Sequence, residues 1–340
     1  MGSDEAFRLC QICAAGISGG ILAMALYKAL RSQPVLSKDR LAVFITGCDS
    51  GFGHSFALHA ARSGYIVYAG CYGSFEGNFE GIDLLKNHSD LIVNKRLRIL
   101  HLDVTNSVSI QNAKLAIEKD LKEESGHLLA VVNNAGFLIF AEAEWQNVEQ
   151  VNKQYQVNTI GPWNISRQFI PLLISGNPPI RPRIVNILSY CTDCPFPCLS
   201  IYTSSKAALK TLSSGMRLEI AKYGVSVVNF NPGDSPSQTR MCCDQERHYA
   251  GMEPPNDPRR LEYFHRCQEK FGNLFPKQPI ATLNDPHLYE TFDAILGSPY
   301  PQNEYISSPL GTRIFFRILG FLPSGLADKI RISILQLPEY

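Results

Sequence analysis

From Leu41 onward, short runs rich in β-branched and aromatic residues alternate with segments of helical length. Such alternation is typical of βαβ units, in which crossover helices join parallel strands. The pattern predicts strands near residues 41–46, 65–70, 97–102, 128–133, 183–188 and 225–230, and helices over Phe52–Arg62, Ser107–Lys122, Val148–Ile174 and Ile201–Lys222. The predicted fold class is therefore α/β, a doubly wound parallel sheet with helices on both faces.

The 340 residues divide into three segments by composition. Residues 39–308 carry the alternating pattern and suffice for one large α/β domain. A hydrophobic segment, 1–38, precedes this domain, and an apolar extension with interspersed basic residues, 309–340, follows it. Within the domain, an insertion at about 234–285 is rich in Pro, Asn and Asp. Such insertions often shape a substrate pocket, so we expect this one to form a lid.

The run Cys10–Tyr27 carries no charge, and basic residues follow it at Lys28, Arg31, Lys38 and Arg40. Its length is at the lower limit for crossing a bilayer, and the basic flank would keep the domain on the cytosolic side. We expect a membrane anchor, and an endoplasmic reticulum location with a cytosol-facing domain; the mitochondrion is the alternative. A loosely packed amphipathic helix is the other interpretation of this run.

The C-terminal extension is apolar, with Arg313, Arg317, Lys329 and Arg331 interspersed. This composition is compatible with a segment that lies on a membrane surface. An amphipathic helix pair packed on the domain would show the same pattern, so both interpretations stay open.

The charge and the cysteines exclude several functions. Lysine and arginine total 32 against 31 acidic residues, so the net charge of +1 argues against nucleic-acid binding. The ten cysteines are scattered, which argues against a disulfide framework. Cys191, Cys194 and Cys198 have a C-x2-C-x3-C spacing, but no second pair or histidine follows at a ligand spacing, so no metal is expected.

The stretch Thr46–Gly53, TGCDSGFG, joins the first predicted strand to the first predicted helix. Glycines let a phosphate approach the backbone, and the first N–H groups of a helix favour an anion. The spacing is Gly-x-x-x-Gly-x-Gly, so by itself the stretch indicates either a phosphate-binding turn or a glycine-rich turn that binds nothing.

Ser189, Tyr202 and Lys206 form a second group. Tyr202 and Lys206 are four apart at the start of a helical pattern, so their side chains share one face. A nearby ammonium would lower the pKa of the phenol, which makes Tyr202 a candidate general acid and base. Ser189 ends a predicted strand, where its hydroxyl could hold the substrate oxygen. Chance placement is the alternative for such common residue types.

Taken together, these motifs resemble the short-chain dehydrogenase/reductase family over roughly Asp39 to Ser308, which implies a Rossmann-type sheet. The resemblance rests on Thr46-Gly47-x3-Gly51-x-Gly53, Asp103-Val104-Thr105, Asn133-Asn134-Ala135-Gly136, Asn158, Ser189, Tyr202-x3-Lys206 and Pro232-Gly233. The sequence of the glycine stretch is most similar to that of a branch containing retinol dehydrogenases, the type 2 17β- and 11β-hydroxysteroid dehydrogenases and D-3-hydroxybutyrate dehydrogenase. Shroud-like proteins of insects, linked to ecdysteroid synthesis, lie near this branch.

The resemblance implies roles for individual residues. Tyr202 would move the proton on the substrate oxygen, Lys206 would bind the nicotinamide ribose, and Asn158 would hold a water that supports Lys206. Ser189 completes this catalytic set. The implied cofactor-binding residues are Thr46, Gly47, Ser50, Gly51, Phe52, Gly53, Cys71, Asp103, Val104, Asn134, Ala135, Gly136, Tyr202, Lys206, Pro232, Gly233 and Thr239.

The position after the second predicted strand distinguishes the two nicotinamide cofactors. NAD-dependent members place an acid there and NADP-dependent members a base, whereas this sequence has Cys71 and Tyr72. The segment from Cys71 to Leu84 contains no lysine or arginine. We therefore expect NAD(H), with NADP(H) as the alternative.

The expected activity is interconversion of an alcohol and a carbonyl on a lipophilic substrate, a steroid or sterol or a retinoid. A D-3-hydroxybutyrate-type hydroxy acid is the alternative, and Arg240, Arg247, Arg259 or Arg260 could clamp its carboxylate. A cofactor-bound sensor or scaffold without turnover is a third hypothesis. Expected partners are the lipophilic small molecule and a membrane; a homo-oligomer stays open.

Overall fold

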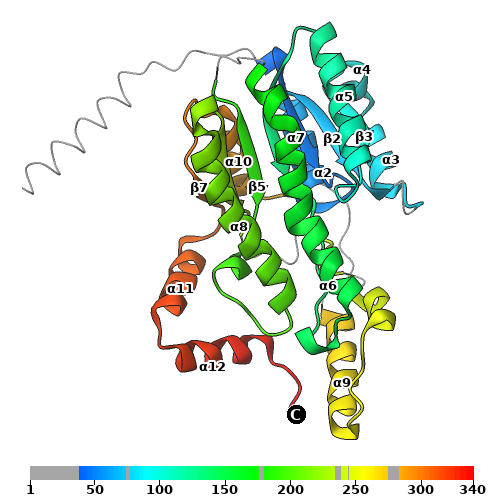
Figure 1. Ribbon diagram of the computed structural model, residues 1–340, viewed down its shortest axis with the longest axis vertical. Helices are drawn as coiled ribbons and strands as arrows, with labels where there is room; N and C mark the ends of the chain where they lie inside the picture. Colours follow the sequence, from blue (N-terminus) through cyan, green and yellow to red (C-terminus); the bar gives the residue numbers. More distant parts are fainter. Residues whose placement is uncertain (1–37, 74–76, 176–179, 234–238, 244, 275–282) are drawn as a thin grey trace, which may run out of the picture. The chain divides into compact units, whose positions relative to one another are not determined.

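The computed structural model describes residues 38–340 except 74–76, 176–179, 234–238, 244 and 275–282. The described chain from Lys38 to Tyr340 forms one compact unit (Figure 1). The expected N-terminal anchor lies outside the described residues, and so does part of the expected lid. None of the helices in the described ranges is long and apolar enough to cross a membrane.

Seven parallel strands form one sheet in the order β3-β2-β1-β4-β5-β6-β7. Six of them match the expected strands within about one residue: β1 (Leu41–Thr46), β2 (Ile66–Cys71), β3 (Leu97–His101), β4 (His127–Asn133), β5 (Arg183–Ile187) and β6 (Ser226–Asn231). The seventh, β7 (Glu304–Ile306), was not expected. It extends the sheet beside β6. The α/β prediction is confirmed, and the strand order reverses between β1 and β4, where such sheets bind ligands.

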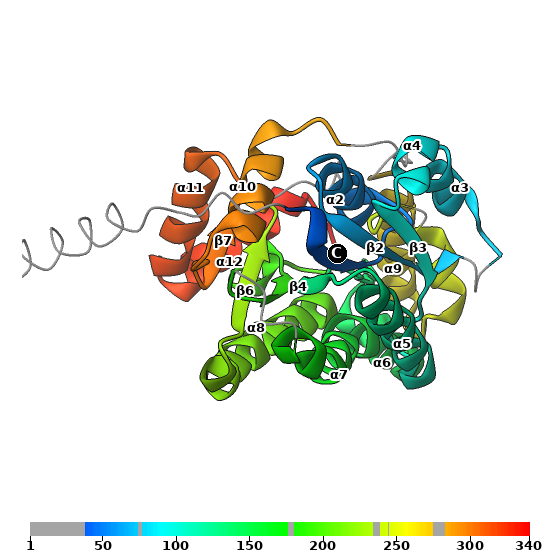
Figure 2. The same cartoon turned by 90° about the horizontal axis from the view of Figure 1, so that it is seen from above.

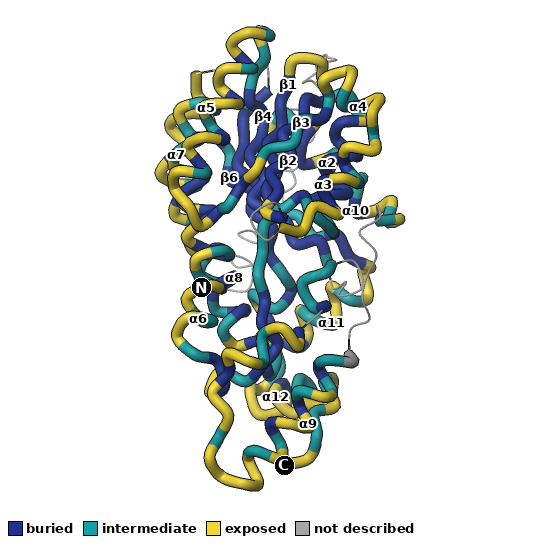
Figure 3. Tube along the Cα trace, turned by 90° about the vertical axis from the view of Figure 1, so that its right-hand side faces the viewer, coloured by how far each residue is buried: buried dark blue, intermediate teal, exposed yellow. Residues whose placement is uncertain are grey.

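Helices cover both faces of the sheet (Figure 2). The helices α5 (Ser107–Glu123), α7 (Gly161–Ser175) and α8 (Ser200–Ile220) lie on one face, and α2 (Gly51–Arg62) and α10 (Pro286–Gly297) lie on the other. Aromatic rings link the sheet to both helical layers, because the ring centres of Phe44 (β1) and Phe169 (α7) lie 4.8 Å apart, and those of Phe56 (α2) and Phe230 (β6) lie 5.9 Å apart. The strands are the most deeply buried part of the chain (Figure 3).

The expected helix Val148–Ile174 is divided into three parts. These are α6 (Val148–Tyr155), a π turn η4 (Gln156–Ile160) and α7. Pro162 has no N–H group and so cannot donate an α-helical hydrogen bond to the carbonyl of Asn158. Gly161 packs so closely that a Cβ there would lie 2.9 Å from the carbonyl oxygen of Val104. The irregular backbone thus centres on Asn158.

Smaller elements complete the unit. They are α3 (Glu80–Lys86), α4 (Ser89–Val93), α9 (Pro258–Leu274), α11 (Leu310–Phe321), α12 (Ser324–Leu335), and the 3-10 turns η1 (Lys38–Arg40), η3 (Ala143–Trp145), η5 (Tyr190–Thr192), η6 (Ala221–Tyr223) and η8 (Gln245–Gly251). The C-terminal extension is thus a pair of helices whose buried residues include Leu319 and Ala327. Within the insertion, η8 and α9 contact each other.

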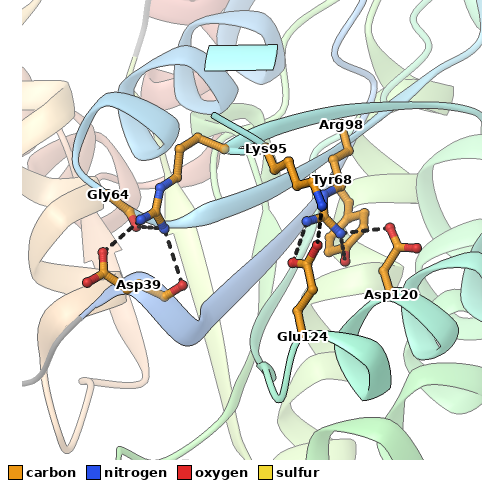
Figure 4. A network of polar contacts seen from close by, with 8 residues as sticks. Asp39, Gly64, Tyr68, Lys95, Arg98, Asp120 and Glu124 are labelled. Carbon is orange, nitrogen blue, oxygen red and sulfur yellow. Dashed lines mark hydrogen bonds and ion pairs between the residues drawn. The ribbon is translucent and has the colours of Figure 1, made fainter. Parts of the chain in front are cut away.

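A network of charged side chains lies at the edge strand β3 of the sheet (Figure 4). Arg98 donates hydrogen bonds to Asp120 at 2.7 Å and Glu124 at 2.5 Å, both on α5, and to the Tyr68 hydroxyl at 3.0 Å. Lys95 adds a second ion pair to Glu124 at 3.6 Å. These contacts fasten α5 to the last strand of the sheet.

Candidate active site

A cavity of about 1040 Å³ lies at the carboxyl edge of the sheet. The loops that follow β1, β2, β3, β4, β5 and β6 all contribute residues to its walls. This is where open α/β sheets bind ligands, because the strand order reverses there. The cavity therefore defines the candidate site.

The glycine turn lines one end of this cavity. Gly47 has φ +70° and Gly51 has φ +59°, backbone conformations that other residues rarely adopt. A Cβ at Gly53 would lie 2.2 Å from the carbonyl oxygen of Gly47. Ser50, Gly51 and Phe52 line the cavity where α2 begins, so a phosphate could reach the helix N-terminus. This tight turn fits the pyrophosphate of a dinucleotide.

Asn134 and Thr46 hold that turn against the end of β4. The Asn134 side chain donates to the carbonyl oxygens of Thr46 at 2.9 Å and Gly47 at 3.1 Å. In return, the Thr46 hydroxyl accepts from the backbone N–H groups of Asn134 at 3.1 Å and Ala135 at 3.0 Å. Thr46 and Gly53 are not cavity-lining; they act by shaping the turn.

The expected contact at Cys71 needs correction. Cys71 is fully buried and its thiol contacts the carbonyl oxygen of Ala69 at 3.8 Å, because this last residue of β2 points into the core. The wall is formed instead by Tyr72 and Gly73. Their backbone N–H groups donate to the carboxylate of Asp49 at 2.9 and 2.7 Å. No motif in the sequence predicts a role for Asp49.

Ser189, Tyr202 and Lys206 meet at the cavity wall. Ser189 lies two residues beyond β5, at the N-cap of η5, and its hydroxyl is hydrogen-bonded to the Tyr202 phenol. Tyr202 and Lys206 lie in the first turns of α8, on the same side. The Lys206 ammonium donates to the carbonyl oxygen of Ile187 at 2.9 Å.

Burial controls the protonation of this group. It raises the pKa of the Tyr202 phenol well above its usual range, against the lowering effect of the Ser189 hydrogen bond. It lowers the pKa of Lys206 to about 8. The chain's own groups therefore do not produce the lowered Tyr202 pKa that the spacing predicts. An oxidised nicotinamide ring would add a positive charge that favours the phenolate.

Asn158 lies behind the wall in the π turn. Its side-chain amide donates to the carbonyl oxygen of Phe137 at 2.7 Å and to the Ser205 hydroxyl at 3.0 Å, and its oxygen accepts from the Phe137 N–H at 2.9 Å. The side chain thus fastens α8 to the loop after β4. Pro162 cannot donate to the Asn158 carbonyl oxygen, and the water-holding role that the resemblance implies for Asn158 stays a prediction.

The remaining expected cofactor residues also line the cavity. They are Gly47, Asp103, Val104, Ala135, Asn134, Gly136, Pro232, Gly233 and Thr239. The absence of a side chain at Gly136 lets Met241 pack against its backbone, since a Cβ there would lie 2.9 Å from the Met241 sulfur. The structure thus brings together all the expected residues as lining or directly supporting groups, except Cys71.

The rest of the cavity has one apolar and one basic wall. Apolar side chains come from the loop after β5 and from the C-terminal helices: Phe196, Leu199, Phe316, Ile334 and Leu335. Phe316 of α11 stacks on Tyr190 at 4.4 Å. Basic side chains come from α6 and the insertion: Lys153, Arg240 and Arg247. Phe316 and Lys153 were not expected at the site, because no local sequence pattern connects them to the catalytic residues.

The parallel sheet, the glycine turn at its carboxyl edge, and Ser189, Tyr202 and Lys206 at one cavity are the features on which the sequence resemblance rests. Residues 41–248 match the short chain dehydrogenase family. The chain belongs to the short-chain dehydrogenase/reductase family, as its motifs suggested.

Several known proteins are similar to this chain. Estradiol 17-beta-dehydrogenase 2 of Rattus norvegicus is 33% identical over 240 residues, which cover 65% of this chain and 60% of that protein. The mitochondrial D-beta-hydroxybutyrate dehydrogenase of Mus musculus is 34% identical over 59% of this chain and 56% of its own length. The chain thus spans less than two thirds of these relatives. Retinol dehydrogenase 5 of Homo sapiens is 27% identical over 94% of this chain and 96% of its own.

Among solved structures, a short chain dehydrogenase/reductase from Burkholderia phymatum in complex with NAD has a TM-score of 0.62. It is 20% identical and covers 83% of this chain and 94% of its own. This similarity shows the shared fold.

Proposed function

We propose that this protein interconverts an alcohol and a carbonyl on a lipophilic substrate, a steroid or sterol or a retinoid, with NAD(H). The observation that carries the proposal is the Ser189–Tyr202–Lys206 group beside an apolar cavity wall. Phe196, Leu199 and Phe316 offer this wall to a ring system or polyene. A cavity of this size suits a molecule larger than a simple alcohol together with a dinucleotide.

In this proposal, each residue acts on a stated atom. A nicotinamide cofactor held along the cavity would, when bound, supply or accept the hydride at the substrate carbon. Ser189 orients the substrate oxygen through its hydroxyl, and Tyr202 gives or takes the proton on that oxygen. Lys206, held by the Ile187 carbonyl, keeps a positive charge near the phenol and offers its remaining N–H groups to the cofactor ribose.

The test is a substrate screen with the purified full chain. A sterol, a retinoid and 3-hydroxybutyrate are each supplied with NAD+ and NADP+, and in the reverse direction with the reduced cofactors, and nicotinamide absorbance is followed. We expect turnover of a sterol or retinoid with NAD+, and a loss of about 10³-fold or more in kcat for Tyr202→Phe with retained NADH binding. Cofactor binding without turnover of any substrate would instead favour the sensor or scaffold hypothesis.

A hydroxy acid substrate is the second candidate, and the basic wall favours it. The Lys153 ammonium lies 4.7 Å from the ring centre of Phe137, and Arg247 lies beside His248 at 3.2 Å. Neither forms an ion pair with a described residue. By contrast, Arg260 pairs with Glu144 and Arg259 bonds to the backbone of Tyr340, so these two do not join the wall. If 3-hydroxybutyrate is turned over in preference to sterols and retinoids, and if Lys153→Gln or Arg247→Gln abolishes this turnover, a hydroxy acid is the substrate and the steroid proposal is wrong.

We further propose that the protein is bound to the endoplasmic reticulum membrane with its domain in the cytosol. The exposed face of α11 supports this, because it is both apolar and basic. It carries Leu310, Ile314, Ile318 and Phe321, with Arg313 and Arg317 beside them. Vesicles containing phosphatidylserine should co-float with the full chain, and less with the double variant Ile318→Glu, Phe321→Glu. Equal flotation would refute a role for α11, and mitochondrial fractionation of the native protein would refute the location.

A further inference from the structure

The carboxylate of Asp49 is bound to the backbone directly after β2. One oxygen accepts from the Tyr72 N–H at 2.9 Å, and the other accepts from the Gly73 N–H at 2.7 Å. A Cβ at Gly73 would lie 2.9 Å from this carboxylate, and one at Gly81 would lie 1.9 Å from the Asp49 carbonyl oxygen. The backbone of the β2 loop and of α3 therefore packs directly on Asp49. The negative charge is held in a fixed place.

That place is the one that distinguishes the two nicotinamide cofactors. In dinucleotide-binding sheets, an acid after the second strand accepts a hydrogen bond from the adenosine ribose, and a base there binds the 2′-phosphate of NADP. Here the acid comes from the glycine turn instead. Asp49, Tyr72 and Gly73 line the same cavity. Burial, and after it the charge of Asp49, raise the pKa of the Cys71 thiol, so the field of this carboxylate acts at the end of β2.

We propose that Asp49 is the residue that selects NAD(H) over NADP(H), in place of the acid that other dinucleotide sheets carry on β2. This inference rests on the proposed NAD(H)-dependent activity. Each carboxylate oxygen has two acceptor sites, so both can bind a ribose hydroxyl while keeping the backbone N–H groups. A 2′-phosphate would bring like charge against a carboxylate that cannot turn away.

Among the described residues that line the cavity, Arg240 lies near this region without offsetting the charge of Asp49. Arg240 lines the cavity from the loop after β6, and its guanidinium lies 3.9 Å from the carboxylate of Glu80 at the start of α3. Its charge is therefore shared with an acid next to the same loop. The charge arrangement disfavours a phosphate at this position.

The test measures binding, so that it does not depend on finding the substrate. Calorimetry on the full chain compares NAD+ with NADP+, and 5′-AMP with adenosine 2′,5′-bisphosphate, for the wild type, Asp49→Asn, Asp49→Ser and Asp49→Glu. We expect the affinity ratio of NADP+ to NAD+ to rise about tenfold or more in Asn and Ser variants. Asp49→Glu, which keeps the charge, should keep the discrimination. The affinity ratio of adenosine 2′,5′-bisphosphate to 5′-AMP should rise in the same variants.

The outcomes separate this inference from the proposed function. An unchanged ratio in folded Asp49→Asn and Asp49→Ser proteins, checked by thermal melting, overturns the role of Asp49 but leaves an NAD(H) enzyme intact. Failure of the wild type to bind either dinucleotide overturns both. If both variants fail to fold, the wild-type protein alone provides the test. Raising the salt concentration from about 0.05 to 0.5 M should then reduce its preference for NAD+ over NADP+, because salt screens the charge of Asp49. Discrimination that is independent of salt would then contradict the proposal.

Discussion

The ammonium of Lys206 donates a hydrogen bond to the carbonyl oxygen of Ile187, the last residue of β5, at 2.9 Å. This contact joins the first turns of α8 to the strand end from which Ser189 follows. It fixes the distance between the two elements that carry the proton-transfer group. The positive charge is thereby held in a buried position, where it costs stability.

The pH dependence of stability should report that cost. Burial lowers the pKa of Lys206 to about 8, whereas in the unfolded chain it is about 10.4. Between these values the unfolded state binds the proton and the folded state does not, so the free energy of unfolding should rise with pH through this window. The rise is on the order of 3 kcal/mol. Below about pH 8 both states are protonated and the penalty is complete.

Denaturant unfolding from pH 7 to 10 checks this for the wild type and Lys206→Met. The variant should be the more stable protein at pH 7, and the difference should shrink toward pH 10. A difference that stays constant across the window would show that Lys206 has an ordinary pKa in the fold.

The glycine turn should tolerate no side chain at Gly53. A Cβ there would lie 2.2 Å from the Gly47 carbonyl oxygen and 2.4 Å from the side-chain nitrogen of Asn134. Gly53→Ala should therefore weaken NAD+ binding by tenfold or more and lower stability by about 2 kcal/mol, through displaced backbone. Gly215→Ala in α8 is the control, since its Cβ would meet no atom within 4 Å. It should keep binding and gain about 0.5–1 kcal/mol. Equal behaviour of the two variants would contradict the packing argument.

The sequence predicted the sheet well because its strands are buried on both faces and read as continuous apolar runs. It missed β7, which has three residues, none of them buried. The π turn at Asn158 was missed because an apolar periodicity continues across it, while the cause, Pro162, changes only backbone hydrogen bonding. The short strand β7 depends on pairing with the distant β6, whereas the π turn depends on a local proline that the apolar periodicity does not register.

The residues of the candidate site also divide into those that a local sequence pattern predicts and those that only the tertiary structure brings together. Tyr202 and Lys206 share one helix, and the glycines share one turn, so spacing identified them. Asp49 acts on Tyr72 from another loop, and Phe316 reaches Tyr190 from the C-terminal helices. Such contacts depend on tertiary structure, so no sequence spacing predicts them. The same reason explains Cys71, whose side chain points into the core although its position matched the motif.

Phe316 should set the affinity for a lipophilic substrate. It lines the cavity and stacks on Tyr190 at 4.4 Å. Phe316→Ala should raise KM for the sterol or retinoid about tenfold with a small change in kcat, because it removes apolar contact area away from the proton-transfer group. Phe315→Ala is the matched control: its side chain is exposed and does not line the cavity. Steady-state kinetics compare them, and a KM effect of equal size in both would refute the assignment.

The Arg98 network should contribute most of the stability gained from ion pairs at the β3 edge. Arg98 is largely shielded from solvent and serves Asp120, Glu124 and Tyr68 together. Arg98→Gln should lower the free energy of unfolding by about 1–3 kcal/mol at pH 7, the usual range for hydrogen bonds to charged groups. Lys119→Gln is the control, because its pair with Glu123 is exposed and 4.0 Å apart. It should cost less than about 0.5 kcal/mol.

The same network predicts an acid dependence. Burial acts to raise the pKa of Glu124, but the hydrogen bond and charge of Arg98, with Lys95, outweigh it and lower the pKa. The stabilisation is therefore complete above the unfolded pKa of about 4.3 and is lost as the pH falls through the lower, folded value. Urea unfolding should show the gap between wild type and Arg98→Gln narrowing below about pH 4. A gap that stays constant down to low pH would mean that Arg98 acts through packing of its side chain rather than through these carboxylates.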